Sequence, residues 1–412
     1  MNKRSKQLWS LAAGAVLLLL GQIPSAMAAS FRGLGYLPGG SFSSSASDVS
    51  ADGSVVVGSA SSGTAPGQSE AFRWSAETGM VGLGDLPGSF FRSNGYGVSD
   101  DGLVVVGESL GTSGIEAFRW SAETGMVGLG DLPGGYFTSS ALGVSADGSV
   151  VVGQGSSFIG PNGNSGEAFR WSAETGMVSL GDLPGGSFYS FATDVSADGS
   201  VVVGGGSSAS RGEAFRWSTQ TGMIGLGELP SGNNSFANAI SADGSVVVGT
   251  AASGTTSGQN EAFRWSAQTG MVGLGDLPGS VFRSGASDVS ANGSVVVGQG
   301  FSTLGFEAFI WDKVNGMRSL QNVLTNDFGL DLRGWRLSRA AGISADGLTI
   351  VGSAYNPSNR NEAWIAQLDA QTVQPVPEPS TLLGSVLLMG FGAFFQRRQQ
   401  RQAKKLGLYC KN

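Results

Sequence analysis

One short segment recurs seven times along this chain and constrains its fold more than any other feature. The pattern Glu-Ala-Phe-Arg-Trp ends at Trp74 and returns with its Trp at positions 120, 171, 217 and 265. It loosens to Glu-Ala-Phe-Ile-Trp ending at Trp311 and to Glu-Ala-Trp ending at Trp364. A period of about 48 residues is typical of repeats that stack into one body, so the 412 residues predict a single repeat domain.

Two hairpin signals flank these segments. Before each one, Asp-Gly or Asn-Gly stands between apolar runs, as in residues 49–58, and such dipeptides are the strongest short signal of a β-hairpin. After each one except the last, a second turn leads into another run such as residues 80–88. Each full unit therefore supplies four strands. The Val-Val-Val run in the second strand is apolar on both faces, as expected for sheets that pack face to face.

The two ends of the array are incomplete in a complementary way. Residues 33–39 look like a fourth strand with no unit before them, and the seventh unit stops after its third strand, at residues 362–368. A ring in which the N-terminal strand completes the last unit explains both ends and removes an exposed sheet edge. We therefore predict an all-β, seven-bladed β-propeller with four-stranded antiparallel blades over residues 30–370. The rival fold, a parallel β-helix, needs no Asp-Gly hairpins.

The repeat resembles the HAF family of extracellular repeats, which is named for a His-Ala-Phe core. The resemblance covers residues 31–370 and implies a location at the cell surface without a defined activity. In this chain glutamate stands at the histidine position of every copy, namely Glu70, Glu116, Glu167, Glu213, Glu261, Glu307 and Glu362. This departure argues against a histidine-based metal or catalytic role.

The N-terminus has the three parts of a secretory signal peptide, which we place at residues 1–28. Cations near the start precede an apolar run at residues 11–20, and small residues stand at the cleavage positions Ala26 and Ala28. The apolar run is too short for an uncleaved membrane anchor, which is the alternative. We therefore expect export across the inner membrane.

The C-terminus carries three segments in order. Residues 371–379 form a linker that ends in a stiff triplet incompatible with a helix: Pro377, Glu378 and Pro379. Residues 380–396 are uncharged and mostly apolar or small, and residues 397–412 are basic. A helix over the apolar part would be slightly shorter than a bilayer core, so we predict a short transmembrane segment followed by a cytoplasmic tail.

This order of segments resembles the PEP-CTERM sorting signal, a bacterial tail that exosortases process. The resemblance covers residues 376 to about 405. It implies a Gram-negative-type envelope, recognition at the Pro-Glu-Pro triplet by an exosortase-type enzyme, and often an association with exopolysaccharide production. The alternative is a plain C-terminal anchor, which would not require the triplet.

No catalytic constellation stands out from the repeats. The chain has no histidine and one cysteine, so it offers no histidine base, no zinc set and no intrachain disulfide. A carboxylate pair for glycoside cleavage stays open, because Asp and Glu recur throughout. The least repetitive stretch, residues 320–337, is either a site or a longer connection that seals the ring, and we favour the connection. We predict no cofactor, no metal and, from the acidic body, no nucleic acid.

The repeated polar residues have structural interpretations. The Asp of each Asp-Gly pair is expected to set its turn rather than bind calcium, because each turn offers a single carboxylate. The Glu of each Glu-Ala-Phe is expected to cap a strand and to neutralise a nearby Arg such as Arg73, with an acidic ring as the alternative. Phe72 and Trp74 share one strand face, which predicts a core between blades.

The sequence also predicts a working surface. In each blade, the turns between strands one and two and between three and four fall on one side, here called the turn face. The other connections fall on the opposite side, the variable face, where the repeats differ in length and sequence. Function tends to lie on such loops. The connections after Leu-Pro-Gly carry aromatics, and apart from Phe42 these are our candidate binding residues: Phe90, Phe91, Tyr136, Phe137, Phe188, Tyr189, Phe236 and Phe282. The alternative is that they tuck between blades.

The function expected from these features is that of an exported interaction protein at the cell surface or in the extracellular matrix. Its expected partners are an exosortase-type enzyme and an exopolysaccharide or another surface protein. Membrane contact is expected only through the C-terminal tail. The alternative function is a secreted polysaccharide-acting hydrolase or lyase on a propeller scaffold.

Overall fold

The computed structural model describes residues 28–368, apart from residues 66, 89, 161–162, 210, 231, 255–258 and 280. The predicted signal peptide up to Met27, including Ala26, lies outside the described residues, as does the tail with Pro377, Glu378 and Pro379. Within the described part, no helix is long and apolar enough to cross a membrane.

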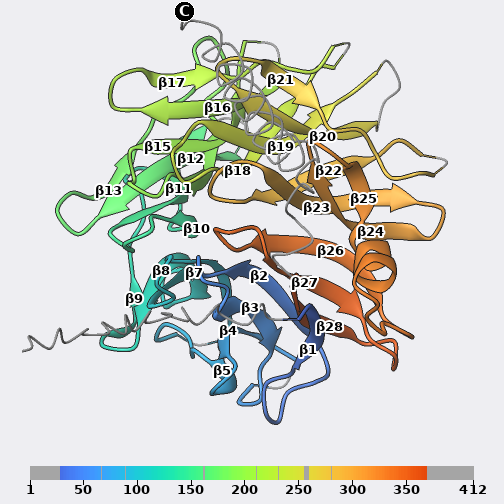
Figure 1. Cartoon of the computed structure of the whole chain (residues 1–412). Helices are drawn as coiled ribbons and strands as arrows, with labels where there is room; N and C mark the ends of the chain where they lie inside the picture. The colour runs from blue at the N-terminus through green and yellow to red at the C-terminus, as the bar shows by residue number, and fades with distance from the viewer. Residues whose placement is uncertain are drawn as a thin grey trace, which may run out of the picture. The chain divides into compact units, whose positions relative to one another are not determined.

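Seven four-stranded antiparallel sheets form the blades of a β-propeller, which confirms the predicted fold (Figure 1). In the first six blades the strands follow chain order. The strands of blades one to three are β2 (Ser44–Val49), β3 (Val55–Ser61), β4 (Ser69–Ser75), β5 (Gly79–Gly82), β6 (Ser93–Val98), β7 (Val104–Leu110), β8 (Ile115–Ser121), β9 (Gly125–Gly128), β10 (Ser139–Val144), β11 (Val150–Gly160), β12 (Gly163–Ser172) and β13 (Gly176–Ser179). Those of blades four to six are β14 (Ser190–Val195), β15 (Val201–Ser207), β16 (Gly212–Ser218), β17 (Gly222–Gly225), β18 (Ser235–Ile240), β19 (Val246–Ala252), β20 (Asn260–Ser266), β21 (Gly270–Gly273), β22 (Ser284–Val289), β23 (Val295–Ser302), β24 (Gly305–Asp312) and β25 (Gly316–Ser319).

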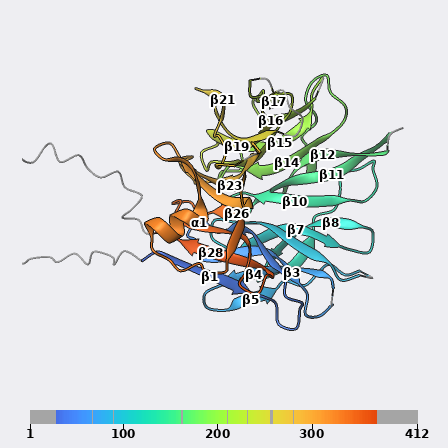
Figure 2. The same cartoon turned by 90° about the vertical axis from the view of Figure 1, so that its right-hand side faces the viewer.

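The seventh blade is built from both ends of the array. Its first three strands are β26 (Arg336–Ile343), β27 (Thr349–Tyr355) and β28 (Asn361–Gln367), and its fourth is β1 (Ser30–Gly35). Strand β1 pairs antiparallel with β28, so that Ser30 lies opposite Gln367 (Figures 1 and 2). The predicted closure of the ring by the N-terminal strand is therefore confirmed.

A second closure lies at the turn face. In each blade, the N–H of the residue before the Asp-Gly or Asn-Gly pair donates to the carbonyl oxygen of its counterpart in the next blade, at 3.0–3.1 Å. The seven bonds form an unbroken circle through Ala51, Asp100, Ala146, Ala197, Ala242, Ala291, Ala345 and back to Ala51. Each blade is thus fixed to both neighbours by main-chain bonds, which place little demand on side-chain identity beyond small size.

The core lies between blades, as the strand patterns predict. Val56 and Val57 are fully buried on opposite faces of β3, and Phe72 and Trp74 are buried on one face of β4. The glycine after each Val-Val-Val run is needed for close packing: a Cβ at Gly58 would overlap the carbonyl oxygen of Ser45 on the neighbouring strand. The repeat therefore combines bulky valines with one position where the backbones approach closely.

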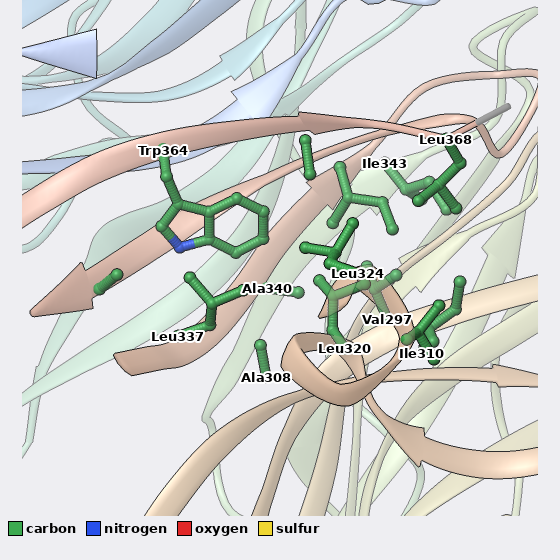
Figure 3. Packing of buried hydrophobic residues seen from close by; sticks show 14 of the residues in the cluster. Val297, Ala308, Ile310, Leu320, Leu324, Leu337, Ala340, Ile343, Trp364 and Leu368 are labelled. Carbon is green, nitrogen blue, oxygen red and sulfur yellow. The ribbon is translucent and has the colours of Figure 1, made fainter. Parts of the chain in front are cut away.

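Trp364 corrects the count of repeated tryptophans. It lies opposite Gly352, just as Phe72 lies opposite Gly58, so it occupies the phenylalanine position of the repeat. Its indole packs fully buried near Leu337 (Figure 3). The larger ring fills the space between the sixth and seventh blades, where the connection differs from all others.

That connection contains the chain's described helical turns, α1 (Leu320–Asn322) and the π-helical turn η1 (Val323–Asp327). Leu320 and Leu324 are fully buried in the same cluster as Trp364 (Figure 3). Residues 320–337 therefore form a connection whose apolar side chains pack between the sixth and seventh blades.

One connection of the variable face differs from its prediction. The variable face was expected to carry loops between the second and third strands, but in blade three β11 and β12 continue through most of residues 154–166 as a hairpin, with Gly160 opposite Gly163.

Candidate functional site

The predicted aromatics divide into exposed and packed groups. Phe90, Tyr136 and Phe188 are 67%, 63% and 72% exposed, and Phe42 is also exposed. Phe137, Tyr189 and Phe282 are exposed to a smaller extent, whereas Phe91 and Phe236 are half-buried. Most of the candidates therefore lie at the surface of the variable face, and the alternative that all tuck between blades is wrong.

Half-buried carboxylates fix two of the connections that carry these aromatics. In the connection of blade three, one oxygen of Asp131 accepts N–H bonds from Leu132 and Ser156, and the other accepts from Thr138. These hydrogen bonds close the segment 131–138 into a fixed loop, here called a bracket, and Tyr136 and Phe137 lie within this loop. Asp276 makes the same type of bracket with the N–H groups of Leu277 and Arg283. The Asp of Leu-Gly-Asp-Leu-Pro thus acts as a loop former.

Three aromatic rings form a continuous row from blade four to blade five. Tyr189 contacts Phe191 with ring centroids 6.0 Å apart, and Phe191 contacts Phe236 at 5.9 Å. Phe236 was predicted in a connection, but it is the second residue of β18, and Phe191 was missed because it lies in β14. A Cβ at Gly205 would clash with both phenylalanines, so the Gly-Gly-Gly run in β15 is the signal that makes room for them.

The Asp-Gly pairs behave as turn formers, as predicted. In blade one, the Asp52 Oδ1 atom accepts hydrogen bonds from the Ser50 hydroxyl at 2.7 Å and from the Ser54 N–H at 2.9 Å. The same Ser-to-Asp bond recurs at Asp147, Asp198 and Asp243. Within the described residues, no group of three His, Cys, Asp or Glu side chains is arranged to hold a metal ion.

The repeated glutamates bind backbone rather than arginine. Glu70 accepts from the Gly84 N–H at 3.2 Å and from the Ser62 hydroxyl at 2.7 Å. Arg73 instead donates through Nε to the carbonyl oxygen of Gly102 in the next blade, at 3.1 Å. The predicted Glu–Arg neutralisation is wrong, because residues three apart on a strand point to opposite faces.

Three aspartates that the sequence analysis overlooked line a cavity of about 120 Å³ between the first strands of the blades: Asp48, Asp194 and Asp288. Each carboxylate bridges two blades. Asp194 accepts from the Val195 N–H of its own strand at 2.8 Å and from the Ile240 N–H of the next blade at 2.9 Å. Asp48 and Asp288 repeat this arrangement with Val98 and Ile343 in their following blades. The signal was present as Asp-Val-Ser in three copies where the others have Gly or Ala before Val or Ile.

These bridges satisfy six of the seven equivalent N–H groups. Val144, in the third blade, has no such acceptor, because glycine stands at the aspartate position of its own blade and of the preceding one, Gly143 and Gly97. Burial raises the pKa of Asp194 to about 7 and that of Asp48 to about 6, and it also raises the pKa of Asp288. No cation is paired with these three carboxylates among the described residues. Their arrangement is that of inter-blade links, since both oxygens of each are occupied by main-chain donors.

Comparison with known proteins supports the fold. No protein-family model and no curated protein matches the chain. The chain is similar to oligogalacturonate lyase from Vibrio parahaemolyticus, with a TM-score of 0.50 and 11% identity over 84% of this chain and 98% of the lyase. It is also similar to a puromycin hydrolase, with a TM-score of 0.50 and 16% identity over 81% of this chain and 54% of the hydrolase. TolB from Acinetobacter baumannii matches at 12% identity and a TM-score of 0.42, over 77% of this chain and 64% of TolB. At such identities the likeness is one of fold alone.

Proposed function

We propose that this chain is an exported interaction protein of the cell envelope that binds an exopolysaccharide through its variable face. In this proposal the signal peptide is removed after Ala28, the repeats are of the HAF type, and an exosortase-type enzyme processes the tail at Pro377, Glu378 and Pro379. The observation that carries the proposal is the set of exposed aromatics on the connections of the variable face, with Phe90 and Tyr136 more than three-fifths exposed.

The chemistry of this face suits sugars. Aromatic rings offer flat apolar surfaces, and the serine, glycine and asparagine residues around them offer polar groups that hydrogen-bond to hydroxyls. The row formed by Tyr189, Phe191 and Phe236 presents aromatic rings in series, which suits a linear chain of sugar units. The scaffold is rigid, so little conformational entropy is lost on binding.

The positions of the chain ends support an outward orientation for this face. The described chain enters β1 at Ser30, opposite Gln367 at the end of β28. The Leu368 N–H then donates to the Leu348 carbonyl oxygen, in the turn between β26 and β27. Entry and exit therefore both lie at the turn face, so a tail held in a membrane would attach there and leave the variable face accessible to a polymer.

The test is binding of the purified exported protein to a panel of polysaccharides, with the reaction mixture also analysed for released products. A double variant, Tyr136→Ser with Phe137→Ser, should weaken binding at least tenfold without changing the melting temperature. The control is Leu103→Ser on the turn face, where an equally exposed leucine replaces the serine found at this place in most copies. Unchanged binding by the double variant would refute the proposal, and release of shortened products would replace it with a polysaccharide-acting enzyme.

A further inference from the structure

The repeated glutamate of the sixth blade lacks the hydrogen-bonded setting that it has in blades one, two, four and five. In blade one, the Glu70 carboxylate lies against Gly82 and accepts from the Gly84 N–H. A Cβ at Gly82 would overlap that carboxylate. The residue equivalent to Gly82 in blade six is Ser319, which carries such a Cβ. In blade three a serine, Ser179, also replaces the glycine, but its hydroxyl donates to Glu167.

The helical turn α1 also removes the main-chain N–H that would donate to Glu307 as Gly84 donates to Glu70. It begins at Leu320, directly after Ser319, and so replaces the extended Leu-Gly-Asp segment that supplies the N–H donor in blade one. The Ser319 hydroxyl accepts from the Asn322 N–H and caps the turn. Among the described residues, the carboxylate of Glu307 therefore has no hydrogen-bond partner, while Glu116, Glu213 and Glu261 keep theirs.

Glu307 lines a pocket of about 420 Å³ beside the connection between the sixth and seventh blades. Its walls are the connection at Leu277 and Pro278, the β23–β24 turn with Leu304, the strand β25, and the helical turns with Asn322 and Asn326. In the described structure the side chains of both asparagines make no hydrogen bond. The pocket thus combines an apolar wall with amide and carboxylate groups that have no protein partner.

Arg318 also lines the pocket, and its positive charge is used by two aspartates, Asp312 and Asp327. Its Nη1 atom bonds to Asp327 at 2.9 Å, and its Nη2 atom lies 3.6 Å from Asp312. Its Nε atom is buried and has no partner. The positive charge of Arg318 is therefore already neutralised, and Glu307 has no ion-pair partner among the described residues.

We propose that this pocket binds an amino sugar with a free, protonated amino group within a glycan chain. The ammonium group would pair with Glu307, and the ring hydroxyls would bond to the side-chain amides of Asn322 and Asn326. The apolar face of the sugar ring would lie against Leu304. The proposal names the class of glycan for the proposed function and rests on it, although its residues are separate from the aromatic row.

Calorimetry with oligosaccharides of glucosamine and of N-acetylglucosamine, matched in length, tests this on the purified exported protein. We expect the deacetylated oligomer to bind at least tenfold more tightly, because acetylation removes the positive charge. Glu307→Gln should abolish that preference. Its control is Glu213→Gln, the same repeat position with its carboxylate held by the Gly227 N–H, which should bind like the unaltered protein.

Equal binding of the two oligomers, or an unchanged preference in Glu307→Gln, would overturn the proposal. If Glu307→Gln fails to fold, Asn326→Ala provides the second variant and should weaken binding of the same oligomer severalfold. Loss of binding in the aromatic variants with no effect at Glu307 would refute the pocket alone. Loss at Glu307 with no effect of the aromatic variants would refute the proposed binding face instead.

Discussion

The N–H of Ala345 donates to the carbonyl oxygen of Ala51 at 3.0 Å and joins the seventh blade to the first. This bond has the same geometry as the six others of its circle, so the ring is closed at the turn face by the main chain of residues 51–345. Strand β1 closes the ring again at the outer edge of the seventh blade. The two closures are independent, which predicts that losing β1 weakens the ring without opening it.

Deletion of residues 31–38 tests the outer closure. The deletion removes buried Leu34 and Leu37 and exposes the edge of β28, so we expect the melting temperature to fall by several degrees or the protein to aggregate. Differential scanning calorimetry measures this. A synthetic peptide covering residues 30–38, added to the truncated protein, should restore part of the loss. A truncated protein that melts like the full one would show that β1 contributes nothing.

A glycine substitution tests the close approach of strands within a blade. At Gly107 a Cβ would overlap the carbonyl oxygen of Asn94 and press on the ring of Phe118, so Gly107→Ala should lower the free energy of unfolding by about 2–4 kcal/mol. Denaturant unfolding checks the value. Gly111→Ala in the same blade is the control, because its Cβ would meet only ordinary contacts. Similar unfolding curves for the two variants would contradict the packing argument.

The repeat pattern predicted the fold because each blade repeats the same local signals. The Asp-Gly and Asn-Gly hairpins, the valine strands that are apolar on both faces and the incomplete ends of the array together determine blade number, strand order and closure. The spacing of tryptophans misled only at Trp364, where the repeat substitutes a larger ring at the phenylalanine position. The motif itself carries the alignment, because Glu362 and Ala363 precede Trp364 as Glu70 and Ala71 precede Phe72. The pairing of Trp364 with Gly352 across the sheet agrees with it.

The site was predicted only in part, since ring geometry brings together residues that the chain keeps far apart. The exposed loop aromatics could be found from their place after Leu-Pro-Gly. The aspartates Asp48 and Asp194 stand out in the sequence as Asp-Val-Ser, but their links do not, because the second donor of each lies in the next blade, 50 and 46 residues away. The repeat motif around Glu307 does not show that its carboxylate lacks a hydrogen-bond partner. That lack arises from Ser319 and from a helical turn that the sequence did not predict.

Replacement of Pro377, Glu378 and Pro379 by alanines tests the proposed sorting tail. If an exosortase-type enzyme reads this triplet, the variant should fold normally and keep its C-terminus through Asn412, whereas the unaltered protein should lose it. Mass spectrometry of the exported protein measures both forms. A tail variant at residues 371–373, outside the triplet, is the control and should be processed. An intact C-terminus in the unaltered protein would contradict the proposal.

The buried aspartates predict an unusual dependence of stability on pH. Burial raises the pKa of Asp194 from 3.8 to about 7, so between these values the folded protein holds a proton that the unfolded chain has lost. This favours folding at low pH, and the gain is lost as the pH rises through about 7. Asp48 acts in the same direction up to about pH 6. The turn aspartates such as Asp147 have lowered pKa values and matter only below about pH 4. The free energy of unfolding should therefore fall between pH 5 and 8.

Asp194→Ala isolates this effect, because the equivalent position of the fifth blade is already an alanine, Ala239. The variant loses two hydrogen bonds, so it should be less stable than the unaltered protein at pH 5. Above pH 7 it also escapes the cost of a buried charge, so the deficit should shrink by roughly 2 kcal/mol between pH 5 and 8. Denaturant unfolding at a series of pH values measures the slope. Asp198→Asn is the control: it alters an exposed turn carboxylate at a place where the sixth blade has Asn292, and it should leave the slope unchanged. A deficit that stays constant from pH 5 to 8 would mean that Asp194 is already ionised throughout this range.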